Sequence, residues 1–167
     1  MRASPSVRSL LPALCAALAL PLAGAAPALA EPGPAPAPFQ LVQFRSASFG
    51  LCIFDTPGGG HNYRLRTCDG DELHQLFTRE VLGDGSVVYK GVASGQCVDN
   101  DGTWAYSHAC NSGDFQHWWE KNKAGPVVTL QNKQTLNCLD TDGDAVFVRD
   151  CGEFIHPNQR WQIVPAR

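Results

Sequence analysis

The sequence predicts an all-β domain with pseudo-threefold symmetry, built from three repeats of about 42 residues. Three observations support this prediction: cysteines spaced in pairs, a Gln-x-aromatic triplet after each pair, and short β-rich stretches separated by turns. No stretch sustains the 3.6-residue period of a long amphipathic helix. Propeller blades have a similar repeat length, but three blades are too few to close a ring.

The cysteines of the globular part define the repeats. Six of them fall as three consecutive pairs with spacings of 16, 13 and 13 residues, at Cys52, Cys68, Cys97, Cys110, Cys138 and Cys151. The first members of these pairs recur after 45 and then 41 residues. Spacing alone leaves fifteen possible connectivities if all six cysteines form disulfides.

A Gln-x-aromatic triplet follows the second cysteine of each repeat. The three copies recur after 41 and 43 residues and are Gln75-Leu76-Phe77, Gln116-His117-Trp118 and Gln159-Arg160-Trp161. We expect the aromatic member of each triplet to fill the core, because a threefold β-structure needs large apolar side chains in its interior.

The stretches before each first cysteine are predicted to be strands. Residues 39–44, 86–89 and 126–130 are rich in β-branched and aromatic side chains. Turn dipeptides divide the chain frequently, as at Asp84-Gly85 and Asp142-Gly143. Short strands and frequent turns are typical of an all-β domain.

Residues 1–30 are predicted to be a signal peptide that is cleaved near Ala30. Two arginines precede an apolar run at 10–22, and Ala28-Leu29-Ala30 has the small-x-small pattern of a cleavage site. The run is too short for a membrane span. We therefore expect a secreted chain, extracellular or periplasmic, with a Pro/Ala-rich linker at 31–38 and one domain at 39–167.

Charge and cysteine content exclude several classes of function. Removal of residues 1–30, which hold two arginines and no acidic residue, changes the formal charge from −3 to −5. An acidic protein is a poor candidate for binding nucleic acid or anionic membranes. An even number of cysteines in an exported chain favours disulfides over metal ligands or a nucleophile.

The repeated order of Cys-hydrophobic-Asp, a second cysteine and Gln-x-Trp resembles that of ricin B-type β-trefoil lectin domains. The resemblance covers about 39–165 and implies a β-trefoil that binds carbohydrate. It also implies one disulfide within each repeat, namely Cys52–Cys68, Cys97–Cys110 and Cys138–Cys151.

The resemblance implies that an Asp after the first cysteine and the amides at the Gln-x-aromatic triplet bind sugar hydroxyls, while an aromatic side chain before the second cysteine stacks on the ring. In repeat three these residues are Asp140, Asn158, Gln159 and Phe147, although Arg149 stands where an aromatic residue is expected. We rank this candidate site first.

Repeat two offers Asp99 and Gln116, with aromatic faces at Tyr106 and His108 and with Trp104 close by in the sequence. Phe115 takes the place of the Asn here. Repeat one ranks last, because its acid, Asp55, is displaced by one residue and arginines replace its aromatic residues.

Simpler roles compete with sugar binding at these positions. Gln116 and Gln159 are equally suited to satisfying backbone groups near the repeat junctions. Asp99 and Asp140 lie close to turns, where Asp often caps its own backbone.

Neither catalysis nor a metal or cofactor is predicted. The stretch Asp140–Asp144 resembles a calcium loop, but its glycine is at the fourth position and the twelfth position is Cys151. The histidines show no paired metal spacing, and no serine or cysteine lies in a recognisable nucleophile setting.

The residues and the resemblance together predict a lectin for galactose-type or related glycans, with sites in repeats two and three. A second resemblance points to another class. Residues 41–44, the cysteine loop after them and the Pro-rich arm look like the ricin-like A and C subunits of cytolethal distending toxins. That resemblance implies partner subunits, including a nuclease, which the chain would deliver to cells.

Overall fold

We describe residues 40–56, 63–152 and 156–166 in a computed structural model. The predicted signal peptide at 1–30 and the linker at 31–38 lie outside these residues. The described part contains twelve strands, four from each repeat.

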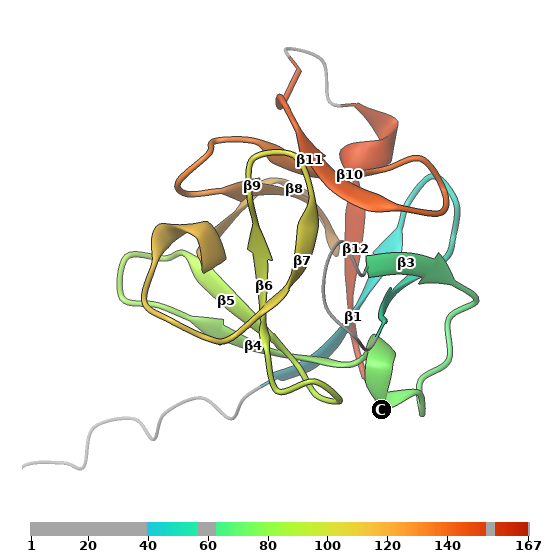
Figure 1. Cartoon of the computed structure of the whole chain (residues 1–167). Coiled ribbons are helices and arrows are strands. Elements are labelled where there is room, and N and C mark those ends of the chain that lie inside the picture. The colour runs from blue at the N-terminus through green and yellow to red at the C-terminus, as the bar shows by residue number, and fades with distance from the viewer. Residues whose placement is uncertain (1–39, 57–62, 153–155, 167) are drawn as a thin grey trace, which may run out of the picture. The chain divides into compact units, whose positions relative to one another are not determined.

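Six strands pair in antiparallel fashion to form a closed barrel, whose strands are labelled in Figure 1. In chain order they are β1 (Gln40–Ser46), β4 (Phe77–Val81), β5 (Val87–Gly91), β8 (Trp118–Ala124), β9 (Val127–Asn132) and β12 (Trp161–Pro165). Each strand pairs with the next, and β12 pairs with β1. The strands predicted at 39–44, 86–89 and 126–130 correspond to β1, β5 and β9.

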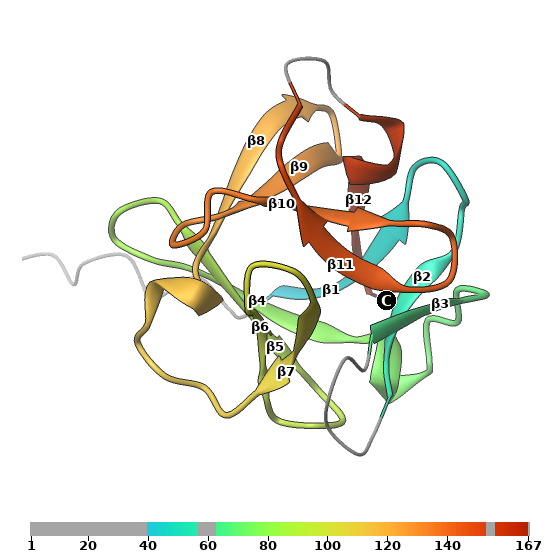
Figure 2. The same cartoon turned by 45° about the horizontal axis from the view of Figure 1, so that its top comes forward.

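The other six strands form one hairpin in each repeat. They are β2 (Cys52–Asp55) with β3 (Tyr63–Arg66), β6 (Cys97–Asn100) with β7 (Ala105–His108), and β10 (Cys138–Thr141) with β11 (Val146–Arg149). The hairpins contact one another through β3, β7 and β11 (Figure 2). A six-stranded barrel with three such hairpins is a β-trefoil, so the predicted fold is confirmed.

The three disulfides implied by the resemblance are present. They join Cys52 to Cys68, Cys97 to Cys110 and Cys138 to Cys151. In each repeat the first cysteine opens a hairpin strand, and the second follows that hairpin. Each bridge therefore ties the hairpin to the loop that leads back to the barrel.

The aromatic residues of the three triplets lie in the core. Phe77, Trp118 and Trp161 are at most 1% exposed. The indole Nε1 of Trp118 donates to the Val98 carbonyl at 3.0 Å, and that of Trp161 donates to the Leu139 carbonyl at 2.9 Å. Burial of an indole is favourable only if its N–H finds an acceptor, and both find one on a hairpin strand.

A single 3-10 turn precedes each of these aromatic residues. The turns are η1 (Leu73–Gln75), η2 (Asp114–Gln116) and η3 (Pro157–Gln159), and each ends at the glutamine of its triplet. Within the described ranges no helix is long and apolar enough to cross a membrane.

A half-buried ion pair joins β4, β5 and β8. Arg79 donates to both oxygens of Glu120 at 2.6 and 2.9 Å, and the Tyr89 hydroxyl donates to Oε1 at 2.6 Å. The Glu120 side chain is 7% exposed. Burial opposes its ionisation, but the hydrogen bonds from Arg79, Tyr89 and Lys123 outweigh burial and lower its pKa to about 2.

This ion pair predicts a pH dependence of stability. Because the pKa of Glu120 is lowered by folding from its ordinary value of 4.5, its contribution is complete above pH 4.5 and is lost as the pH falls towards 2. Between pH 4.5 and pH 2, the unfolding free energy of the wild-type protein should fall through protonation of Glu120. In Glu120→Gln this fall should be smaller by up to about 3 kcal/mol. Urea denaturation at several pH values measures the decrease. The matched control is Glu80→Gln, an exposed carboxylate on β4; an equal effect of both variants would contradict the assignment.

Candidate functional site

The strand register aligns the candidate residues of the three repeats. Asp99 lies directly opposite Tyr106 on β7, and Asp140 lies directly opposite Phe147 on β11. The equivalent pair in repeat one is Phe54 and Arg64. Directly opposite residues of an antiparallel pair project from the same face. Each predicted Asp therefore shares a face with the aromatic residue assigned to its repeat.

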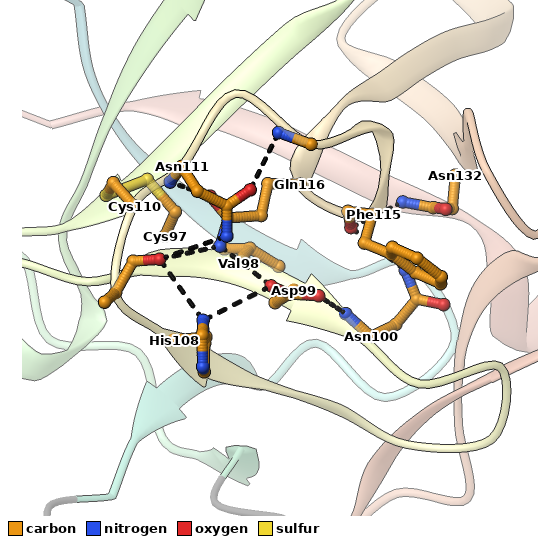
Figure 3. A network of polar contacts seen from close by, with 12 residues as sticks. Cys97, Val98, Asp99, Asn100, His108, Cys110, Asn111, Phe115, Gln116 and Asn132 are labelled. Atoms are coloured by element: carbon orange, nitrogen blue, oxygen red, sulfur yellow. Dashed lines mark hydrogen bonds and ion pairs between the residues drawn. A yellow bond between two sulfur atoms is a disulfide. The ribbon is translucent and has the colours of Figure 1, made fainter.

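In repeat two, the side chain of Gln116 connects Asp99 to the loop at Cys110 (Figure 3). Its Nε2 donates to Asp99 Oδ2 at 2.8 Å and to the Ala109 carbonyl at 3.0 Å, and its Oε1 accepts from the Asn111 N–H at 2.8 Å. The other Asp99 oxygen accepts from the Asn100 N–H at 2.7 Å. The carboxylate is thus held by one hydrogen bond on each oxygen, and each oxygen keeps further acceptor capacity.

Two rings, those of Tyr106 and His108, lie on the strand paired with this carboxylate. Tyr106, directly opposite Asp99, is half-buried. His108 Nδ1 lies 3.8 Å from Asp99 Oδ2 (Figure 3). Phe115, which replaces the Asn of the sugar-binding pattern, is 43% exposed. Burial raises the pKa of Tyr106, with smaller contributions from Asp99 and Asp101, so its hydroxyl remains a hydrogen-bond donor at neutral pH.

Repeat three has the same arrangement of Gln and Asp. Gln159 Nε2 donates to Asp140 Oδ2 and to the Asp150 carbonyl, each at 3.0 Å. Asp140 Oδ1 accepts from the Thr141 N–H at 2.7 Å. Asn158 precedes Gln159 in η3 and is half-buried. Repeat three therefore combines a fixed carboxylate with an asparagine next to the glutamine that holds it.

In repeat three, the aromatic side chain Phe147 has two neighbours, Arg149 and Trp104. The guanidinium of Arg149 lies over the ring of Phe147, 4.9 Å from its centroid. Trp104, which is near Tyr106 in the sequence, contacts Phe147 edge to face at 6.4 Å between centroids. Local sequence patterns could not predict this contact, because it joins the hairpin of repeat two to the hairpin of repeat three.

Repeat one lacks the carboxylate. Its position is taken by Phe54, whose ring stacks on His74 at 5.1 Å between centroids. Asp55, the expected displaced acid, aligns instead with Asn100 and Thr141 and is 2% exposed. Adjacent residues of a strand point to opposite faces, so a displacement by one residue moves this acid away from the site face.

The side-chain amides of Gln116 and Gln159 make hydrogen bonds within the protein. Both side chains are at most 2% exposed, and both hydrogens of each Nε2 are donated within the protein. These hydrogen bonds give both amides a positioning role, beside which direct contact with a sugar hydroxyl, as expected from the resemblance, stays a prediction. The alternative expectation, satisfaction of backbone groups, describes part of that role.

The acidic turn at Asp140–Asp144 forms by internal hydrogen bonds. Asp142 Oδ1 accepts from the N–H groups of Asp144 and Ala145 at 3.0 and 2.8 Å, which lowers its pKa. Among the residues that the structure describes, no group of three or more His, Cys, Asp or Glu side chains could hold a metal ion. The two carboxylate sites can accept hydrogen bonds from neutral hydroxyl groups.

The chain was compared with protein families, curated sequences and solved structures. Residues 40–163 match the family profile described as the ricin-type beta-trefoil lectin domain. No curated protein sequence matches the chain.

Solved structures show the same fold. The designed threefold-symmetric protein ThreeFoil is similar with a TM-score of 0.64 and 19% identity, over 74% of this chain and 97% of that chain. SeviL bound to the asialo-GM1 saccharide gives a TM-score of 0.64 and 13% identity, over 77% and 99%. The cytolethal distending toxin of Haemophilus ducreyi gives 0.65 and 13%, over 76% and 84%.

Proposed function

Because the chain belongs to the ricin-type β-trefoil lectin family, we propose that it is a secreted lectin that binds galactose-type glycans through repeats two and three. A ricin-type lectin domain is a carbohydrate-binding, non-catalytic fold. Beyond membership of this family, we propose the class of sugar bound, the number of sugar-binding sites and the secretion of the chain. Export is supported by the three disulfides, which persist in oxidising compartments.

One observation carries the proposal: Asp99 and Asp140 occupy equivalent positions, and the glutamine of the following triplet orients each of them. A carboxylate held in this way accepts a hydrogen bond from a sugar hydroxyl without first losing side-chain freedom. An aromatic side chain next to it offers an apolar surface to the C–H groups of the ring. SeviL, which has the same fold, is bound to a saccharide in its structure.

The two sites differ in what surrounds the carboxylate. In repeat three, Asn158 adds an amide that can donate to and accept from hydroxyl groups. In repeat two, Phe115 replaces that amide, while Tyr106 supplies a neutral hydroxyl. Each shallow site should bind a monosaccharide on the order of mM, and two sites acting on one multivalent glycan should bind more tightly.

Substitution of the two carboxylates tests this function. Asp140→Ala and Asp99→Ala should each weaken retention on a galactose-agarose column, and the double variant should not be retained. The reason is that each substitution removes the acceptor of a sugar hydroxyl, which costs roughly 1.5–3 kcal/mol. The matched control, Asp71→Ala, removes an exposed carboxylate in repeat one and should leave retention unchanged.

The column result is checked on a glycan array, which reports the sugar class directly. Failure of the wild-type protein to bind any glycan would contradict the proposal. Binding only to glycans without galactose would contradict the sugar class alone.

A second candidate function is delivery of a nuclease as a subunit of a toxin that resembles the cytolethal distending toxins. The similarity in fold to the Haemophilus ducreyi toxin supports this candidate. Affinity purification of the tagged chain from its native source should then recover a nuclease subunit in stoichiometric amount. Recovery of the chain alone would contradict the delivery function and leave the lectin proposal in place.

A further inference from the structure

The site in repeat three continues across the repeat boundary to Trp104. Phe147 has two direct partners on opposite sides: Asp140 on β10, and Trp104 through an isolated antiparallel bridge. Directly opposite residues of antiparallel strands project from the same face. Asp140, Phe147 and Trp104 therefore form one row on one face, with the carboxylate at one end and the indole at the other.

The backbone holds this row together. The Val148 N–H, next to Phe147, donates to the Thr103 carbonyl, next to Trp104, at 2.9 Å. With about 4.5–5.5 Å between directly opposite residues, the row is roughly 10 Å long. This length exceeds the width of a single pyranose ring.

The exposure of the row changes along its length. Asp140 is 2% exposed, whereas Phe147 and Trp104 are half-buried. Arg149 covers one face of Phe147. The indole of Trp104 is consequently the large aromatic surface at the end of the row away from the carboxylate.

We infer that the site in repeat three binds a galactoside of at least two rings, with one ring at Asp140 and the next ring against Trp104. This inference rests on the proposed lectin function and specifies the ligand of that same site. Trp104 supplies the aromatic surface that Arg149, at the expected stacking position, does not provide. A half-buried indole is already restricted in its rotamers, so contact with a ring costs little additional entropy.

The protein contains a natural control for this arrangement. Asp101 Oδ1 accepts from the N–H groups of Thr103 and Trp104, just as Asp142 Oδ1 accepts from those of Asp144 and Ala145. Trp104 and Ala145 thus occupy equivalent positions in two equivalent turns. Since Ala145 bridges to Arg64 in the same way as Trp104 bridges to Phe147, alanine is compatible with this turn and its bridge.

The test uses the Asp99→Ala protein, in which repeat three holds the remaining complete site. Methyl β-galactoside and lactose are titrated by calorimetry with and without Trp104→Ala. Loss of the indole should weaken lactose binding about fivefold to tenfold and change methyl β-galactoside binding less than about twofold, since the indole contacts the second ring. Trp104→Phe should recover part of the lactose affinity, and thermal unfolding confirms that each variant is folded.

A second arm uses the Asp140→Ala protein, in which repeat two is the complete site. There, Trp104→Ala should change the binding of lactose and of methyl β-galactoside to the same extent, because the contact of Trp104 with a second ring is assigned to repeat three. In the Asp99→Ala protein, the inference would be overturned if Trp104→Ala left lactose affinity unchanged, or if it weakened the binding of both sugars equally. Either result would leave the proposed lectin function in place. A wild-type protein that binds neither sugar would overturn the galactose-binding proposal and this extension with it.

Discussion

The side-chain amide of the glutamine in each Gln-x-aromatic triplet links the hairpins, the disulfide loops and the candidate sites. In all three repeats its Nε2 donates to the carbonyl of the residue before the second cysteine, at 2.8, 3.0 and 3.0 Å. In repeats two and three its second hydrogen goes to the Asp carboxylate. Two residues later, the tryptophan indole donates to the carbonyl that immediately precedes this Asp. One short segment therefore fixes both the core and the carboxylate.

Repeat one shows what the fold retains without a carboxylate. Gln75 still donates to the Thr67 carbonyl and accepts from the Asp69 N–H, so the disulfide loop is held as in repeat two. Its Oε1 also accepts from Gln43 at 3.2 Å. Phe54 occupies the position that Asp99 and Asp140 have in the other repeats, and its ring stacks on His74, the residue before Gln75. The glutamine thus makes the same loop contact in every repeat, whereas its contact with an Asp carboxylate is present in repeats two and three.

Sequence periodicity predicted the repeats and the core aromatics, because these depend on spacing and burial within one repeat. The disulfide pairing was implied by the resemblance to the lectin family. The candidate sites were predicted less completely. Assigning Gln116 and Gln159 to direct sugar contact requires knowing where their hydrogens go, which depends on carbonyls of a loop elsewhere in the repeat. The Trp104–Phe147 contact depends on how two repeats meet, and local sequence carries no signal for that.

The side-chain amide signals of the three glutamines in a ¹⁵N–¹H spectrum test the central claim most directly. If the glutamines of repeats two and three orient sugar-binding carboxylates, addition of lactose will shift the Nε2 signals of Gln116 and Gln159. The Nε2 signal of Gln75, which has no carboxylate partner, will not move. Lactose binding that leaves the signals of Gln116 and Gln159 unchanged, or that shifts all three equally, would contradict the account.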